Sequence, residues 1–287
     1  METVLMPSNP ALQYNQPNFS PVQMTFMDHL EALRWHLVRS FIVLILAAIG
    51  VFIFVDSIFD NIVFAPARAD FITYISLCRF GHTLNLGDSL CMPPINMSLL
   101  GNTINGTFMS AITISFTCGI LIAFPYILWE LWKFIKPALS AKEARSLRGS
   151  IGWISFYFIT GATFGYFLLA PFTFNFLGNF TLGTMGSITY LPTINDYIDT
   201  LSSIVIGCGL AFELPVVTYI LSSIGIVTPG LLKKYRKYAY LVILILAAVI
   251  TPSPDWTSQA IVTVPLVILF EISILISKRV ERKRNLA

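Results

Sequence analysis

Charged residues are scarce in this chain of 287 residues. Asp, Glu, Lys and Arg together make up 11% of it, and 55% of its residues are hydrophobic, whereas soluble globular domains carry about 25% charged residues. A water-soluble fold would have no interior large enough for so much apolar surface, so the composition excludes a soluble enzyme or binding domain. Roughly 20 apolar residues are needed for each membrane crossing, which leaves room for several spans and for no second large soluble domain.

Catalytic and cofactor-binding motifs are missing as well. The sequence contains no G-x-S-x-G nucleophile motif, no phosphate-binding G-x-x-x-x-G-K-[ST] loop and no H-E-x-x-H metal motif. The spacing of its cysteines and histidines is not typical of a zinc, haem or iron–sulfur site. His29 and His36 fall at a predicted membrane edge, where we expect packing or hydrogen bonding and no catalysis. We therefore predict a protein that is not an enzyme, with no metal, no cofactor and no nucleic-acid partner.

Long apolar runs make up most of what is present, and they predict an all-α polytopic membrane protein with six transmembrane helices. The run over 238–251 has only about 14 apolar residues, which as a helix would measure roughly 21 Å against a hydrocarbon core of about 30 Å. We therefore expect short fifth and sixth helices that thin the bilayer locally. The predicted spans cover about 37–55, 107–135, 150–172, 198–226, 238–251 and 256–277.

Three parts of the chain follow from this pattern: a flexible cytoplasmic tail over 1–25, a six-helix transmembrane domain over 26–277 and a basic cytoplasmic tail over 278–287. The first tail is rich in Pro, Asn and Gln and lacks the basic start and apolar core of a cleavable signal peptide. The next segment, 24–37, has apolar residues at helical spacing with polar residues between them. This pattern predicts an amphipathic helix lying on the membrane surface before the first span.

A large external loop is expected after the first span, over about 56–106. It contains several Pro and Gly residues, Pro66 among them, and is too long for a simple turn, so we predict an ordered external cap. Cys78 and Cys91 share this loop. In an oxidising compartment they could close a disulfide ring that contributes up to about 3 kcal/mol, or they could remain as two thiols.

The cations determine the predicted orientation. All of the 18 Lys and Arg residues except Arg68 and Arg79 fall in segments that six spans place on one side of the membrane. Because cytoplasmic loops carry the excess of Lys and Arg, both termini and both basic loops are expected in the cytoplasm. We therefore predict a multi-pass protein of the cell inner membrane.

Three carboxylates stand in apolar surroundings: Glu130, Glu213 and Glu271. Ionised groups inside a membrane are costly, so such groups face a cavity or a partner, or become protonated. The alternative is a glutamate that is hydrogen-bonded within the protein and only fixes the packing of its helix. Both interpretations stay open for each residue.

At four places the chain resembles the TatC family, the signal-recognising subunit of the twin-arginine (Sec-independent) protein translocase. The likeness runs from about Met24 to Arg282, and the four elements occur in the family's order. The matching residues are His29-Leu30-Glu31-Ala32-Leu33-Arg34 at the entry, Phe134-Ile135-Lys136-Pro137-Ala138-Leu139 with Glu143 in the first basic loop, Phe212-Glu213-Leu214-Pro215 in the fourth span, and Thr251-Pro252 with Asp255 and Gln259 in the last external turn.

The resemblance implies that the cytoplasmic face binds signal peptides with two consecutive arginines, and that the chain supports export of folded proteins. Carboxylates at a partly desolvated interface suit this task, since bidentate hydrogen bonds distinguish arginine from lysine. It also implies single-span partner subunits of the TatA and TatB type, twin-arginine precursors as cargo, and homo-oligomers within a larger complex in the lipid bilayer. The implied signal-binding residues are Glu31, Arg34, Phe134 and Glu143; the implied structural or partner-binding residues are Glu213, Pro215, Glu130, Pro66, Asp255 and Gln259.

One residue departs from the family's entry motif. The glutamate that usually precedes Leu-Arg is Ala32 here, and Glu31 lies one position earlier. A shift of one residue turns a helix by about 100°, so Glu31 has a different direction from the family's carboxylate. We therefore expect Glu143→Ala to weaken signal binding more than Glu31→Ala.

Two other functions would use the same residues differently. A secondary transporter would use the buried glutamates as proton or ion sites and would show internal repeats, and we find none. A membrane-embedded enzyme would show a nucleophile with its base or a metal set, which the sequence also lacks.

Overall fold

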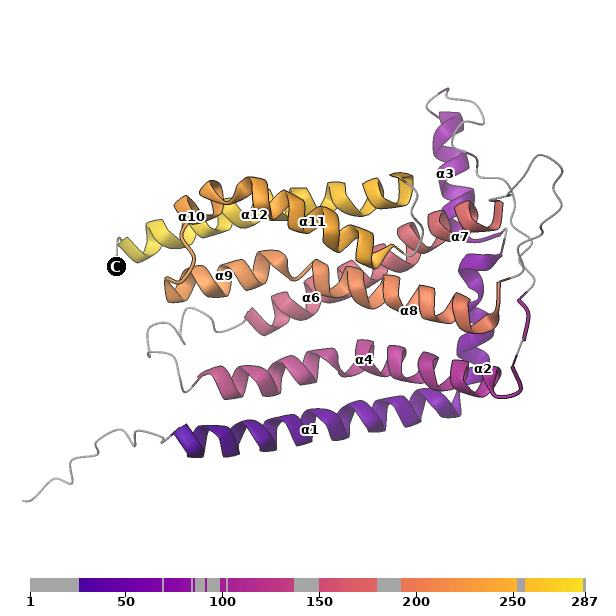
Figure 1. Cartoon of the computed structure of the whole chain (residues 1–287), viewed down its shortest axis with the longest axis horizontal. Helices are drawn as coiled ribbons and strands as arrows, with labels where there is room; N and C mark the ends of the chain where they lie inside the picture. The colour runs from indigo at the N-terminus through magenta and orange to yellow at the C-terminus, as the bar shows by residue number, and fades with distance from the viewer. Residues whose placement is uncertain are drawn as a thin grey trace, which may run out of the picture.

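The computed structural model describes residues 26–68, 70–83, 85, 91, 99–101, 103–136, 150–179, 192–251 and 256–285, and this part of the chain is almost entirely helical. Long helices lie side by side with their axes roughly along one direction (Figure 1). The main packing pairs are α1 with α4, α4 with α6, α4 with α8, α6 with α8, α9 with α12 and α11 with α12. These helices are α1 Phe26–Ile53, α4 Gly106–Ile135, α6 Ser150–Phe164, α8 Ile194–Ala211, α9 Leu214–Ile224, α11 Arg236–Ile250 and α12 Trp256–Asn285.

In the described part of the chain, five helical stretches are long and apolar enough to cross a membrane, which confirms a helical membrane protein with several spans. α11 has 15 residues and is not among the five, so the sixth span stays a prediction. The stretches are Glu31–Ile53, Gly106–Ile135, Gly152–Asn179, Ile194–Ile224 and Ser258–Arg282.

α1 differs from the prediction at its start. A surface helix over 24–37 followed by a separate span is wrong, because α1 is one helix from Phe26 to Ile53. The segment from Phe26 to Ile49 contains no Pro and no Gly, and it is rich in Leu and Ala, which favour an unbroken helix. The polar first turns therefore continue along the axis of the apolar part.

The predicted fourth span is two helices. α8 ends at Ala211, and α9 begins at Leu214 after a short break at Phe212 and Glu213. Pro215 lies in the first turn of α9 and has no N–H to donate to the carbonyl of Ala211, so an unbroken helix would lose a hydrogen bond here. α9 ends at Gly225, whose φ of 89° is the left-handed conformation that glycine adopts easily.

The last helix is longer than predicted. α12 has 30 residues and continues through the basic segment to Asn285, so the expectation of a short sixth helix is wrong. Lys, Arg and Glu are good helix formers, and they extend the helix beyond the apolar residues of the span. α11, the predicted short fifth helix, is short.

The two ends of the bundle carry different structures (Figure 1). At one end, here named the basic end, α1 begins and α4 and α12 end, next to the short α10 Pro229–Lys234. The opposite end, named the cap end, carries a set of short helices and turns: α2 Val55–Ile58, η1 Phe59–Val63, η2 Ala65–Ala67, α3 Ile72–Thr83, η5 Gly165–Leu169 and α7 Ala170–Asn179. The predicted ordered cap after the first span corresponds to α2, η1, η2 and α3.

Tyrosine hydroxyls fasten the cap to the long helices. Tyr197 donates to the carbonyl of Val63 at 2.7 Å, and Tyr166 donates to that of Ile62 at 2.6 Å. Tyr74 lies 3.0 Å from the carbonyl of Pro66 and 3.2 Å from that of Pro171, so its proton is shared between η2 and α7. Burial raises the pKa of Tyr74, which keeps its hydroxyl protonated as a donor.

Candidate functional site

A buried carboxylate joins α1 to α4 at the basic end. The side chain of Glu130 is 1% exposed, and its two oxygens have different partners. His36 Nδ1 of α1 lies 2.6 Å from Oε2, and Lys133 Nζ of α4 donates to Oε1 at 3.0 Å. This trio, named the Glu130 cluster, holds the start of α1 beside the end of α4.

Close packing of the two helices brings these groups together. A Cβ atom on Gly119 of α4 would lie 3.0 Å from the backbone nitrogen of Ala48 in α1, so a larger residue would push the helices apart. Because the helices run antiparallel, this contact places the first turns of α1 next to the last turns of α4. Small residues at a helix crossing are a common feature of membrane bundles.

Aromatic rings surround the Glu130 cluster. Lys133 Nζ lies 3.3 Å from the centre of the Trp129 ring, a cation–π contact. Phe134 packs edge-on against the His36 ring, with 6.3 Å between the ring centres. The predicted signal-binding residue Phe134 is half-buried, and its ring contacts that of His36. These rings exclude water from one side of the cluster, which strengthens its electrostatic contacts.

Glu31 and Arg34 lie on the first turns of α1 and are both exposed. Within the described ranges neither side chain forms an ion pair or a hydrogen bond, so the carboxylate of Glu31 is open to a ligand. The structure brings Arg34 and Glu31 to the same end as Phe134. Glu143 and the rest of the first basic loop, 137–149, lie outside the described residues.

Glu213 has a different environment from Glu130. It is the residue before α9, at the break between α8 and α9, and it is 8% exposed. Neither oxygen of its carboxyl has a hydrogen-bond partner among the described residues, although the backbone of Phe158 lies close enough to interact with it. A buried polar group without a partner is rare in native structures. The carboxyl of Glu213 can therefore still form a hydrogen bond with another molecule, whereas both oxygens of Glu130 already have partners within the chain.

Glu271 is paired, like Glu130. Arg236 of α11 forms an ion pair with it, and Tyr240 donates to its Oε1 at 2.5 Å. These contacts tie α11 to α12 and favour the packing interpretation for Glu271. A secondary transporter would use buried glutamates as proton or ion sites. Since Glu130 and Glu271 are paired with cations, Glu213 is the one of the three that is left for such a site.

The turn between α11 and α12 is described only in part. Thr251 is buried and donates to the carbonyl of Ala247 at 2.9 Å, and Gln259 Nε2 lies 3.4 Å from the carbonyl of Leu244. The first contact closes the end of α11, and the second joins the start of α12 to α11. Asp255 lies outside the described residues, and Pro215 is buried at the start of α9, next to Glu213.

In the cap, the structure pairs Cys78 with Cys91 as a disulfide. His82 Nε2 lies 3.7 Å from Cys91 Sγ, and ligand atoms of the three residues lie within 4.8 Å of one another. The disulfide takes up both sulfurs, so no thiolate is available to a metal here. Pro66, the predicted structural residue of the cap, is buried in η2 beneath Tyr74.

The residues that sequence reasoning missed are Lys133 and Trp129, and it gave His36 no more than a packing or hydrogen-bonding role. Helical spacing was the available signal, since Trp129, Glu130 and Lys133 share one turn of a predicted helix. The partner on the other helix, 94 residues earlier in the chain, has no such local signal.

Comparison with known proteins gives one family throughout. The family model described as Sec-independent protein translocase protein (TatC) matches residues 28–265. A protein named Sec-independent protein translocase protein TatC from Blattabacterium sp. subsp. Periplaneta americana is 38% identical over 263 residues, which cover 91% of this chain and 98% of that protein. The protein of the same name from Carboxydothermus hydrogenoformans is 35% identical and covers 91% of this chain and 95% of its own length.

Solved structures agree with the sequence comparison. A crystal structure of the twin-arginine translocase receptor TatC superimposes with a TM-score of 0.67 at 28% sequence identity. The match covers 88% of this chain and 99% of that one.

Proposed function

Since this chain belongs to the TatC family of Sec-independent protein translocase proteins, we propose that its basic end binds the twin-arginine signal peptides of proteins to be exported. The chain is a membrane-embedded translocase subunit and not a catalytic enzyme. The observation that carries the proposal is an exposed, unpaired carboxylate, Glu31, on a helix whose position is fixed by the Glu130 cluster.

The chemistry of the basic end suits two arginines. A guanidinium forms two parallel hydrogen bonds with one carboxylate, and a lysine ammonium cannot reproduce this geometry. Glu31 supplies one carboxylate and, in our proposal, Glu143 supplies the second. Arg34 repels a third cation and orients the entry helix. The ring of Phe134, packed against His36, provides an apolar border that limits solvent around the pair.

The orientation belongs to the same proposal. The basic end faces the cytoplasm, as the positive-inside rule requires, and the cap faces the other side of the inner membrane. α11 is then the fifth of six spans, and both termini lie in the cytoplasm. Support comes from the described part of the chain, in which α1 starts and α4, α10 and α12 end on one side (Figure 1).

Partner subunits with a single span complete the translocase in this proposal. The unpaired carboxyl of Glu213, next to Pro215 at the helix break, supports a contact with a polar side chain of such a TatA- or TatB-type helix. In the same proposal Gln259 and Asp255 take part in the contact with partner subunits, and copies of the chain assemble within the larger complex. If Glu213→Gln and Glu213→Ala both left export and co-purification of the partners unchanged, Glu213 would have only a packing role.

The experiment that tests signal recognition is photocrosslinking in membranes. A photoreactive residue replaces Glu31 or, in a second variant, Glu143, so that each variant keeps the other carboxylate. The precursor carries either two arginines or two lysines. We expect adducts with the twin-arginine precursor and a loss of roughly tenfold with the lysine form, because a charge-assisted hydrogen bond is worth about 1.5–3 kcal/mol. Equal adducts with both precursors would contradict the proposal.

A matched set of alanine variants separates the two carboxylates. A photoreactive residue at a third, common position reports binding, and Glu143→Ala is expected to lower the adduct yield more than Glu31→Ala. Glu281→Ala, which removes an acid from α12 at the same end, serves as the control and should leave the yield unchanged. Equal yields from Glu31→Ala and Glu143→Ala would show that the shift of the motif glutamate has no consequence for binding.

A further inference from the structure

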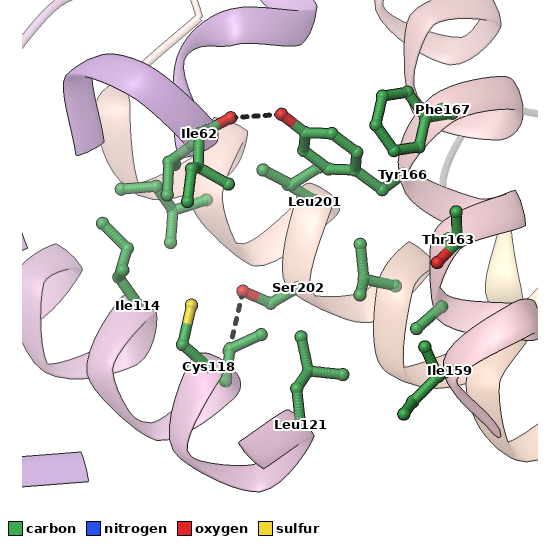
Figure 2. A pocket seen from close by; sticks show the side chains of 15 residues that line it. Ile62, Ile114, Cys118, Leu121, Ile159, Thr163, Tyr166, Phe167, Leu201 and Ser202 are labelled. Carbon is green, nitrogen blue, oxygen red and sulfur yellow. Dashed lines mark hydrogen bonds between the residues drawn. The ribbon is translucent and has the colours of Figure 1, made fainter. Parts of the chain in front are cut away.

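A cavity of about 240 Å³ lies between α4, α6 and α8, close to the cap end (Figure 2). Ile114, Cys118 and Leu121 of α4 line one side, Ile159 of α6 lines another, and Leu201 and Ser202 of α8 line the third. The bond from the Tyr166 hydroxyl to the Ile62 carbonyl crosses the end of the cavity nearest the cap (Figure 2).

The lining excludes a polar or charged ligand. Among the residues that the structure describes, no Asp, Glu, Lys, Arg or His borders the cavity. Thr117 and Ser202 satisfy each other, since Thr117 Oγ1 donates to Ser202 Oγ at 3.0 Å. What remains is mostly hydrocarbon, with the thiol of Cys118 and the hydroxyl of Thr163. A ligand gains only dispersion contacts and apolar burial here.

The helices that line the cavity are held in place by close contacts with neighbouring helices, and these contacts keep the cavity open. A Cβ atom on Gly161 of α6 would lie 2.5 Å from the carbonyl oxygen of Cys208 in α8, so these two helices already touch. α4 is held toward α1 by the contact between Gly119 and Ala48. The rings of Phe124 in α4 and Phe158 in α6 stack on each other, and the cavity lies on the cap side of this contact, where the two helices separate.

The mouth opens sideways at membrane depth. Ile62, Ile159 and Phe167 line the cavity and are 50%, 52% and 43% exposed. Ile159 and Phe167 belong to a helical stretch that is long and apolar enough to span the membrane. Around such a mouth the solvent is lipid hydrocarbon and not water.

We propose that this cavity is a binding site for one acyl chain of a membrane lipid. A cavity of about 150 Å³ already admits benzene, so 240 Å³ accepts a length of hydrocarbon chain. A helix with its side chains is about 10–12 Å across and is too wide to enter. Along α4 the lining extends from roughly 12 Å to roughly 22 Å beyond Gly106, which assigns the chain to the leaflet next to the cap.

Photolabelling with a lipid tests the site directly. The full chain is reconstituted in vesicles of phosphatidylethanolamine and phosphatidylglycerol that contain a phosphatidylcholine with a diazirine midway along one acyl chain. After irradiation, adducts are located residue by residue by mass spectrometry. We expect adducts at Cys118 and Leu121 inside the cavity as well as at Ile122, which is 64% exposed on the outer surface of α4.

A variant that fills the cavity distinguishes labelling inside the cavity from labelling of the lipid-exposed surface. Ala162 lines the cavity and is 7% exposed, so Ala162→Phe places a ring inside it. Adducts at Cys118 should be lost while those at Ile122 remain. Thr160→Phe, on the same helix outside the cavity, is the matched control and should leave both unchanged. Thr163→Phe at the mouth provides the same test if Ala162→Phe does not fold.

Two results would overturn the proposal. One is the absence of adducts at Cys118 and Leu121 in the unmodified protein while Ile122 is labelled. The other is adducts at Cys118 that Ala162→Phe does not reduce. A photoreactive residue at Ile159 distinguishes the occupants, because capture of a polypeptide in place of a lipid would assign the mouth to a partner helix.

Discussion

At the cap end, neutral hydroxyls of Tyr74, Tyr166 and Tyr197 donate to backbone carbonyls, whereas at the basic end Glu130 lies between two side chains that can carry positive charge. Neutral hydrogen bonds change little with salt, but charge pairs near water are screened by it. The comparison indicates that the cap is held by contacts whose strength changes little with salt. The basic end is held by contacts whose strength depends on nearby charges, including those of a charged ligand.

The largest effect should come from removing both cationic partners of Glu130. The double variant His36→Leu/Lys133→Leu leaves a 1% exposed carboxylate without either partner. We expect the free energy of unfolding in detergent to fall by about 3 kcal/mol, the lower end of the range for a broken buried pair, because the Lys133 side chain is 38% exposed. Denaturant titration followed by circular dichroism measures the change.

A triple variant provides the control for this experiment. Adding Glu130→Leu to the double variant removes the isolated charge, and apolar replacement of a whole buried ion pair is often neutral. The triple variant should therefore recover most of the lost stability. If it is no more stable than the double variant, the loss comes from packing and the basic end is not held by charge.

A smaller effect is expected from the disulfide in the cap. Cys78→Ser/Cys91→Ser opens a ring with a sequence separation of 13 residues, and we expect the stability of the cap to fall by about 2 kcal/mol. Limited proteolysis of the cap, with and without a reducing agent, measures the change. Reduction should make the unmodified protein as sensitive as the variant and should have no effect on the variant itself.

The smallest effect is expected from a single cap hydroxyl. Tyr74→Phe removes the donor shared by the carbonyls of Pro66 and Pro171, and a neutral hydrogen bond contributes about 1 kcal/mol. The loss should be the same at low and at high salt, whereas Glu130→Gln at the basic end should lose part of its effect in high salt. A salt-dependent loss from Tyr74→Phe would remove the distinction between the two ends.

The sequence is enough for features that depend on local pattern. An apolar run predicted a helix over 107–135, and α4 occupies Gly106–Ile135, because a span is defined by its own residues. The break at Glu213 had a local signal in Pro215 that the prediction of one span over 198–226 did not use. The length of α12 was underestimated because apolar content marks where a span ends, and a helix can continue beyond it.

Contacts between distant segments could not be predicted in the same way. His36 and Glu130 are 94 residues apart, and Arg236 and Glu271 are 35 apart. Their pairing depends on which helices pack together and at what height, and these are properties of the whole bundle. The sequence identified Glu130, Glu213 and Glu271 as costly groups, but only the structure separates the two that are paired from Glu213.

The short α11 has a consequence for how the protein is made. Ile243, Ala247 and Ile250 form its buried stripe, and α12 is its main neighbour. A 15-residue helix is too short to be retained securely in the bilayer on its own. Arg236 at its start is neutralised by Glu271 on α12. In the proposed six-span topology α11 therefore depends on the segment that follows it, and we expect the two helices to insert together as one hairpin.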